Sequence, residues 1–179
     1  MMLQIDHRES RDVDIFLTDP QLLAFLDPER RDFQYEIQPD GYEGDGARFL
    51  KLAFDKLGEI DFIVASAMSQ SSPIPMTVEG ENVLLDSVPE IIVKKICHRG
   101  SSIKPRDIFD IAAAGEQHEH SLVAELRGYS DEAKKTVEAI DRLNADFVNR
   151  AIAQLAIKDR YKEVAKVAIE RSKEILRTV

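Results

Sequence analysis

The sequence predicts an α/β fold of the α+β kind, with a mixed sheet, flanking helices and a helical C-terminal portion. Two patterns carry this prediction. Runs typical of strands occupy the first half of the chain, whereas apolar residues recur at three- and four-residue spacing in the second half. We therefore expect an α/β core over residues 1–115 and a helical portion over residues 116–179. A chain of 179 residues can bury such a core without disulfides.

The first predicted strand carries two acids. Residues 12–17 alternate between acidic or aromatic and aliphatic side chains, and strand side chains repeat every two residues, so Asp12 and Asp14 leave one face together. Two close carboxylates repel unless a cation or a proton compensates. Paired carboxylates suit Mg²⁺ or Mn²⁺, which hold phosphate oxygens during phosphoryl or nucleotidyl transfer. The alternative is an exposed edge strand whose acids face water.

The elements that follow are short. Asp19 can cap a helix whose first turn accommodates Pro20. Proline and glycines over residues 39–46 predict a loop, and a segment with Gly58 joins two strand-like runs into a hairpin. The predicted strands after the first cover residues 33–37, 49–54, 60–64 and 74–78.

Asp61 interrupts a mainly apolar strand. A charge inside such a run is costly unless it serves a site, so Asp61 is a candidate third carboxylate. The alternative, an acid at a strand end in solvent, is equally compatible with the pattern.

After residue 83, the sequence pattern changes from that of strands to that of helices. One helix is predicted to begin near Ser87 and to break at Gly100, and another is predicted to run from Lys104 to near Gly115. These helices hold the one strongly basic stretch of an acidic chain. Bases beside carboxylates suit a triphosphate or an RNA backbone, although a solvated helical face explains them as well. The basic residues of the stretch are Lys94, Lys95, Arg99, Lys104 and Arg106.

The remaining sequence predicts scaffold. Residues 131–178 have the periodicity of two helices, which would cover the sheet or form a partner surface. His118 and His120 are predicted to lie in a polar junction between helices, where a solvated loop is favoured over a zinc site. Cys97 lies among apolar helix positions and is predicted to be a buried structural thiol.

Composition limits the setting and the partners. A net charge of -9 argues against nonspecific nucleic-acid binding by the whole surface, although a local basic patch stays possible. The single cysteine excludes an intrachain disulfide and favours a reducing, cytoplasmic setting. No signal-like segment and no long apolar run is visible, so no membrane association is expected.

Two motifs together resemble a known family. Residues 7–16, HRESRDVDIF, resemble the R-x-S-x-D-x-D-[LI]-F signature of the AbiEii/AbiGii toxin-family nucleotidyltransferases, within the DNA polymerase β-like superfamily. The stretch PEIIVKKI at residues 89–96, then Arg99 and PRDIFD at residues 105–110, is similar to the family's second block. Two motifs in the right order are more specific than either alone.

The resemblance implies a nucleotidyltransferase-like mixed sheet and roles for individual residues. Asp12 and Asp14 would bind the divalent metal, Mg²⁺ or Mn²⁺, with Asp61 as a possible third ligand. Lys95 would contact the triphosphate, and Asp107 would be the polar group of the last motif. The implied substrate-binding residues are Arg8, Ser10, Lys94 (as an alternative to Lys95), Arg99 and Arg106.

The resemblance also implies an activity. This activity is transfer of a nucleotide from an NTP to an acceptor, with tRNA as a candidate acceptor. The chain would be a toxin opposed by a cognate antitoxin, and its oligomeric state is left open. Family members carry a glycine-containing turn before the D-x-D strand, whereas this sequence starts with MMLQI, so we expect a shortened chain or a degenerate site. The alternatives are a catalytically inactive binding module acting through its helical tail or basic patch, and an RNA-binding protein without chemistry.

Overall fold

The structure, a computed structural model, describes residues 1–28, 30 and 36–179. The chain forms two compact units. Residues 10–67 form one, called the sheet unit below, and residues 1–9 together with 68–179 form the other, called the helical unit. These units differ from the predicted division after residue 115, which falls inside a long helix, α4 (Pro105–Leu126). The strand predicted over residues 33–37 lies mostly outside the described residues.

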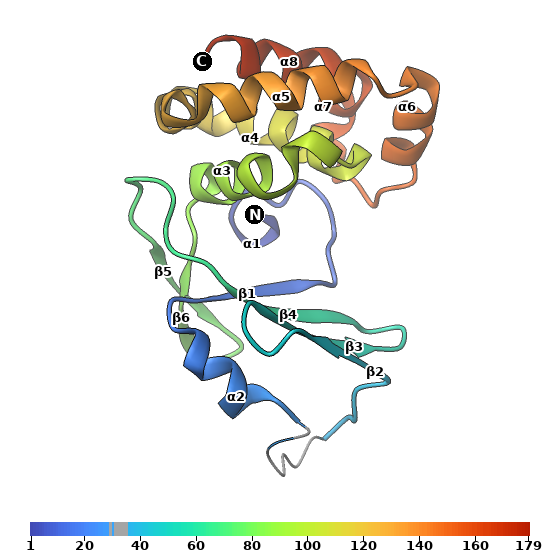
Figure 1. Cartoon of the computed structure of the whole chain (residues 1–179). Coiled ribbons are helices and arrows are strands. Elements are labelled where there is room, and N and C mark those ends of the chain that lie inside the picture. Colours follow the sequence, from blue (N-terminus) through green and yellow to red (C-terminus); the bar gives the residue numbers. More distant parts are fainter. Residues whose placement is uncertain (29, 31–35) are drawn as a thin grey trace. The chain divides into compact units, whose positions relative to one another are not determined.

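The sheet unit contains a four-stranded mixed sheet, which confirms the predicted fold class (Figure 1). The strand order is β1-β4-β3-β2, with β1 parallel to β4 and the other neighbours antiparallel. The predicted hairpin is present, but the loop predicted over residues 39–46 is wrong, because a strand pairs there with β3. The strands are β1 (Val13–Leu17), β2 (Gly41–Gly44), β3 (Phe49–Phe54) and β4 (Gly58–Val64).

The two faces of this sheet differ in chemistry because strand side chains alternate. On one face, Leu50 and Leu52 pack with Leu23 in a small buried core. Leu23 belongs to α2 (Leu23–Leu26), which follows a 3₁₀ turn over Pro20–Leu22. The side chain of Asp19 accepts a hydrogen bond from the Gln21 amide at 2.8 Å, so the predicted cap is confirmed. The charged side chains are left to the opposite face.

Gly58 is required where β4 begins. Its φ of +140° lies in a region that side-chain-bearing residues rarely adopt. A Cβ added there would lie 2.1 Å from the carbonyl oxygen of Arg11, which leads into β1. The glycine therefore lets the acidic strand and its neighbour start side by side.

The helical unit contains more residues and more helices than the helical portion predicted over residues 116–179. The strand after residue 80 was missed, and the helix expected to stop near Gly115 continues to Leu126. His118, with φ −127° and ψ 15°, departs from helical geometry, so α4 consists of two helices that meet at a kink there. The helix junction predicted at His118 and His120 is therefore present, but it is a kink and not a loop. Residues 131–178 contain four α-helices in place of two. The elements are α1 (Met2–Ile5), β5 (Ile74–Val78), β6 (Glu81–Leu85), α3 (Val88–Arg99), α4, α5 (Ser130–Asp141), α6 (Ala145–Ala153), α7 (Lys162–Lys166) and α8 (Ala168–Arg177), with 3₁₀ turns at Gly100–Ser102, Arg127–Tyr129 and Asp159–Tyr161.

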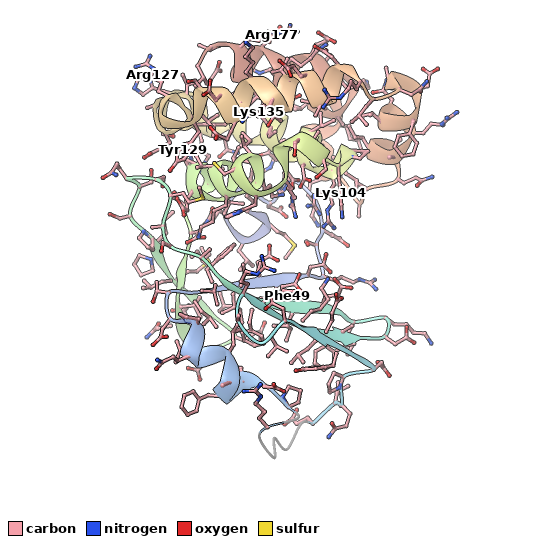
Figure 2. All side chains as sticks on the ribbon, viewed as in Figure 1. Phe49, Lys104, Arg127, Tyr129, Lys135 and Arg177 are labelled. Carbon is pink, nitrogen blue, oxygen red and sulfur yellow. The ribbon has the colours of Figure 1, made fainter. Side chains whose placement is uncertain are left out.

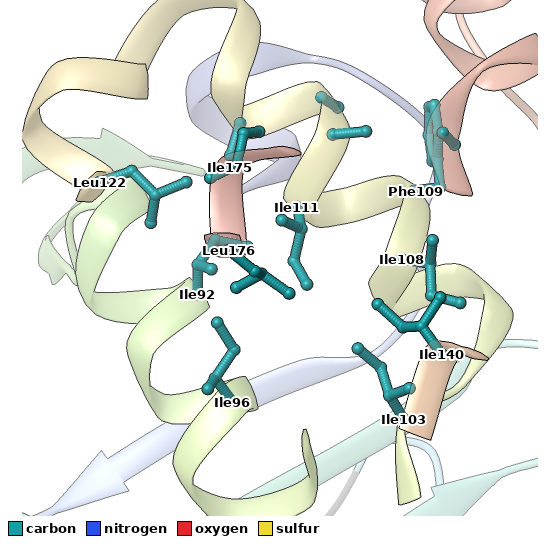
Figure 3. Close-up of a cluster of buried hydrophobic side chains, with 14 of the residues drawn as sticks. Ile92, Ile96, Ile103, Ile108, Phe109, Ile111, Leu122, Ile140, Ile175 and Leu176 are labelled. Atoms are coloured by element: carbon teal, nitrogen blue, oxygen red, sulfur yellow. The ribbon is translucent and has the colours of Figure 1, made fainter. Parts of the chain in front are cut away.

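The core of the helical unit lies between α3, α4, α5 and α8 (Figure 3). Ile92, Ile111 and Ile175 are fully buried in it. Burying side chains of this size contributes about 1.5–3 kcal/mol each, so the core can hold α3 and α4 in a fixed relation. Cys97 is half-buried against this core, and burial raises the pKa of its thiol to about 11.

The segment that enters the helical unit after residue 67 is tightly bound. The Glu90 carboxylate accepts hydrogen bonds from the amides of Met68, at 2.9 Å, and Ser69, at 2.6 Å. Tyr129, labelled in Figure 2, donates its hydroxyl to the Met68 carbonyl. Glu90 lies in the first turn of α3, so this turn of the helix holds the segment at residues 68–69 in place. Among the described residues, no helix combines the length and the apolar character needed to cross a bilayer.

Candidate functional site

Charged side chains form a line across the polar face of the sheet. Asp14 of β1 is the register partner of Asp61 in β4, and Asp61 is in turn the partner of Lys51 in β3. Lys51 is opposite Glu43 of β2. Register partners on neighbouring strands point to the same face, so these four residues form one row, called the charged row below. Asp14 and Asp61 are thereby brought together as predicted.

Asp61 is the least solvated acid of this row. Its side chain is 23% exposed, and its Oδ1 atom is buried and accepts no hydrogen bond from the residues described. The nearest cation is the Nζ atom of Lys51, at 3.5 Å from Oδ1. Burial raises the pKa of Asp61; Lys51 opposes the rise and the negative charge of Asp14 adds to it.

The acids at the start of the sheet are the candidate metal ligands of this unit. Asp12 precedes β1, and both Asp12 and Asp14 are exposed. In the described part of the chain, no three His, Cys, Asp or Glu side chains are already grouped around one metal position. Mg²⁺ is commonly held by one or two carboxylates with water and substrate phosphates completing its shell. A neighbouring pair with one unsatisfied, buried oxygen fits that mode of binding.

Replacing Asp61 with asparagine is expected to stabilise the sheet unit at neutral pH. Because the folded pKa is raised, ionisation costs stability, and this cost appears as the pH rises above the ordinary value of 3.8. Asparagine resembles the protonated acid, and Lys51 keeps its Glu59 partner at 2.6 Å. Thermal unfolding should show a variant more stable than wild type at neutral pH, with the difference vanishing in acid. A less stable variant at neutral pH would contradict this.

A second polar cluster lies in the helical unit, between α3 and α4. Asp107 and Asp110 are one turn apart on α4 and almost fully buried. Lys95 of α3 contacts both carboxylates, with its Nζ atom 3.2 Å from Asp107 Oδ1. The guanidinium of Arg99, one turn further along α3, donates to the same Asp107 oxygen at 2.8 Å. The predicted residues Lys95, Arg99 and Asp107 therefore meet.

Asp110 also binds the beginning of the chain. His7 donates from Nε2 to Asp110 Oδ1 at 2.8 Å, and Arg8 donates from Nε to the same oxygen at 2.8 Å and from Nη2 to Oδ2 at 3.1 Å. Burial alone would raise the pKa of Asp110, but Lys95 and the hydrogen bonds from His7 and Arg8 hold it well below its ordinary value. The carboxylate is therefore ionised and links α4, α3 and the segment leading to β1.

The other predicted binding residues are not part of this cluster. Lys94 is buried in ion pairs with Asp86, at 2.6 Å, and Glu90, at 3.1 Å. Its partners favour a structural role, which leaves Lys95 as the stronger candidate for a phosphate contact. Arg106 lies in the first turn of α4, and Ser10 is partly buried just before β1.

Three residues of these clusters were not predicted. Asp110 and His7 stand inside the two motifs, but neither was assigned a role. The three-residue spacing of Asp107 and Asp110 on a helix was an available signal, since such residues share a face. Lys51 is a charge inside the apolar run FLKLAF, the same signal that singled out Asp61.

Comparison with known proteins gives one family match. The family model described as the nucleotidyl transferase AbiEii toxin of a type IV toxin–antitoxin system matches residues 1–172. Among solved structures, that of a provisionally assigned nucleotidyltransferase from H. pylori is 15% identical with a TM-score of 0.48, over 95% of this chain and 77% of that chain. A search of curated proteins finds no match.

The family match covers nearly the whole chain, which places it among the nucleotidyltransferases of toxin–antitoxin systems. The chain belongs to the AbiEii toxin family. The family resemblance first noted in the two motifs is thereby confirmed.

Proposed function

We propose that this chain is a metal-dependent nucleotidyltransferase that moves a nucleotide from an NTP to an acceptor. The observation that carries the proposal is the register pairing of Asp14 with Asp61, whose buried Oδ1 atom accepts no hydrogen bond from a described residue. Two like charges held side by side without a full set of partners cost free energy. A divalent cation would offset that cost.

The residues of the sheet unit would divide the chemistry as follows. Asp14 and Asp61, with Asp12 beside them in sequence, would hold Mg²⁺ or Mn²⁺. The bound ion would polarise the α-phosphate and help neutralise its developing charge. Asp61 is also proposed to help activate the attacking hydroxyl of the acceptor.

In the helical unit, Lys95 is proposed to bind phosphate oxygens. Its ammonium is fixed by Asp107 and Asp110, and its side chain is only 14% exposed. A cation held in advance need not be reoriented when charge develops, which is how such groups lower a barrier. Arg8 and Arg99 share the same two carboxylates and are proposed to support phosphate binding.

The family supports a proposal about the protein partner. AbiEii is a toxin of a type IV toxin–antitoxin system. We propose tRNA as the acceptor and a cognate antitoxin as the protein that opposes the activity.

The proposal is tested by incubating the chain with each labelled NTP, Mg²⁺ and bulk tRNA, with and without a chelator. Wild type should label the RNA only when the metal is present, and Asp14→Ala should not label it. Equal labelling by both proteins, or none by either, would remove the enzyme function. Calorimetric titration with the four NTPs then decides the remaining alternative, because an inactive binding module should show no magnesium-dependent heat.

A further inference from the structure

Within its four strands, the charged residues on the polar face of the sheet are acids and one lysine. The charged row contains Glu43, Lys51, Asp61 and Asp14, and Glu59 lies two residues before Asp61, on the same face of β4. Lys51 stands in the middle of an otherwise apolar strand. Ordering a lysine there costs side-chain entropy, so its ammonium must gain from its surroundings.

The contacts of Lys51 are unequal. Its Nζ atom donates to Glu59 at 2.6 Å and lies 3.5 Å from Asp61 Oδ1. The strong hydrogen bond therefore belongs to Glu59, while Asp61 receives positive charge and its Oδ1 atom stays without a hydrogen bond from any described residue. An oxygen in this state can still be shared with a second cation.

We propose that the Lys51 ammonium is the counter-ion of the acids in the charged row when no metal is bound. We further propose that this ammonium sets the affinity of the row for a divalent cation. This inference rests on the proposed metal site at Asp14 and Asp61. Without metal, Lys51 reduces the repulsion between Asp61 and Asp14 and stabilises the sheet. When a divalent cation is present, the same ammonium repels it, so the lysine keeps the affinity moderate.

The size of the effect follows from distance. Charges a few ångströms apart near a protein surface interact strongly, whereas charges on an exposed turn are screened by water and salt. Removing the ammonium should therefore tighten divalent-cation binding about tenfold, after allowance for partial exposure. Removing an exposed lysine elsewhere in the same unit should have little effect.

The test compares Lys51→Met with Lys56→Met, which makes the same charge change. Lys56 lies in the β3–β4 turn and its side chain is 87% exposed, with the Nζ atom 3.9 Å from Asp55 Oδ2. Mn²⁺ binding is followed by the loss of the free-ion electron paramagnetic resonance signal, and stability by thermal unfolding in chelator. Lys51→Met should bind Mn²⁺ about tenfold more tightly than wild type and unfold at a lower temperature. Lys56→Met should match wild type in both.

Several results would overturn the inference. If wild type binds Mn²⁺ through Asp14 and Lys51→Met binds equally or more weakly, the counter-ion role is wrong and the proposed function survives. If a gain in Lys51→Met persists when Asp61→Asn is added, the site is elsewhere and the role is also wrong. If neither protein binds Mn²⁺, the proposed metal site fails together with the inference.

A second variant serves if Lys51→Met does not fold. Glu59→Gln keeps Lys51 but removes the oxygen that holds it at 2.6 Å. The ammonium should then pair fully with Asp61 and weaken Mn²⁺ binding relative to an Asp55→Asn control, which changes charge equally at an exposed position. Unchanged affinity in Glu59→Gln would overturn the inference.

Discussion

Replacing Asp110 with asparagine is expected to lower the free energy of unfolding of the helical unit by about 3–5 kcal/mol, the usual cost of breaking a buried ion pair on one side. Asp110 is 1% exposed and accepts hydrogen bonds from His7, Arg8 and Lys95. The substitution removes the negative charge but leaves its buried cations in place. It also turns an amide N–H₂ group toward groups that donate.

Denaturant unfolding followed by the helical circular dichroism signal measures this loss. The control is Asp141→Asn, which removes a carboxylate that pairs with Lys173 and is 47% exposed. Exposed pairs are worth up to about 1 kcal/mol, so the control should stay near wild type. If Asp110→Asn is as stable as the control, the buried network does not hold the unit together.

The pH dependence gives an independent check on Asp110. A carboxylate whose folded pKa is depressed contributes stability that is fully present above its ordinary pKa of 3.8. That contribution is lost as the pH falls through the lower folded pKa. The difference in stability between wild type and Asp110→Asn should therefore shrink in strong acid and be constant near neutral pH.

Replacing Asp14 with asparagine is expected to reduce nucleotide transfer by about 10²–10³-fold. Metal-assisted charge stabilisation is worth several kcal/mol, and about 1.4 kcal/mol corresponds to each tenfold in rate. Asp14 is exposed on an edge strand and lies beside Asp61. Removing its charge relieves repulsion, so the fold should be retained while the rate falls.

The measurement is the initial rate of label transfer from the preferred NTP at saturating and subsaturating Mg²⁺. Asp55→Asn, in the β3–β4 turn, is the matched control and should transfer at the wild-type rate. Asp14→Asn should raise the Mg²⁺ concentration needed for half-maximal rate. Wild-type rates from Asp14→Asn, in a protein that is active otherwise, would exclude Asp14 as a metal ligand.

Local patterns in the sequence were sufficient to predict several elements. Alternation predicted β1, and strand-like runs joined by a segment with Gly58 predicted β3 and β4. Apolar periodicity with Ser87 and Lys104 predicted the beginnings of α3 and α4. These patterns succeed because period and capping depend on neighbours in the chain. The exact end of a helix was harder to predict: α4 passes Gly115 and breaks from helical geometry at His118, and Gly115 instead packs closely against Ile175.

The sequence by itself determined which residues carry charge within apolar strands and which two motifs place the chain in its family. Only the tertiary structure decided their partners. Strand register put Lys51 between Glu43 and Asp61, and helix packing brought Asp110 to His7, residues that are 103 positions apart in the chain. The physical reason is that pairing across strands and between helices depends on contacts distant in sequence, which no local pattern records.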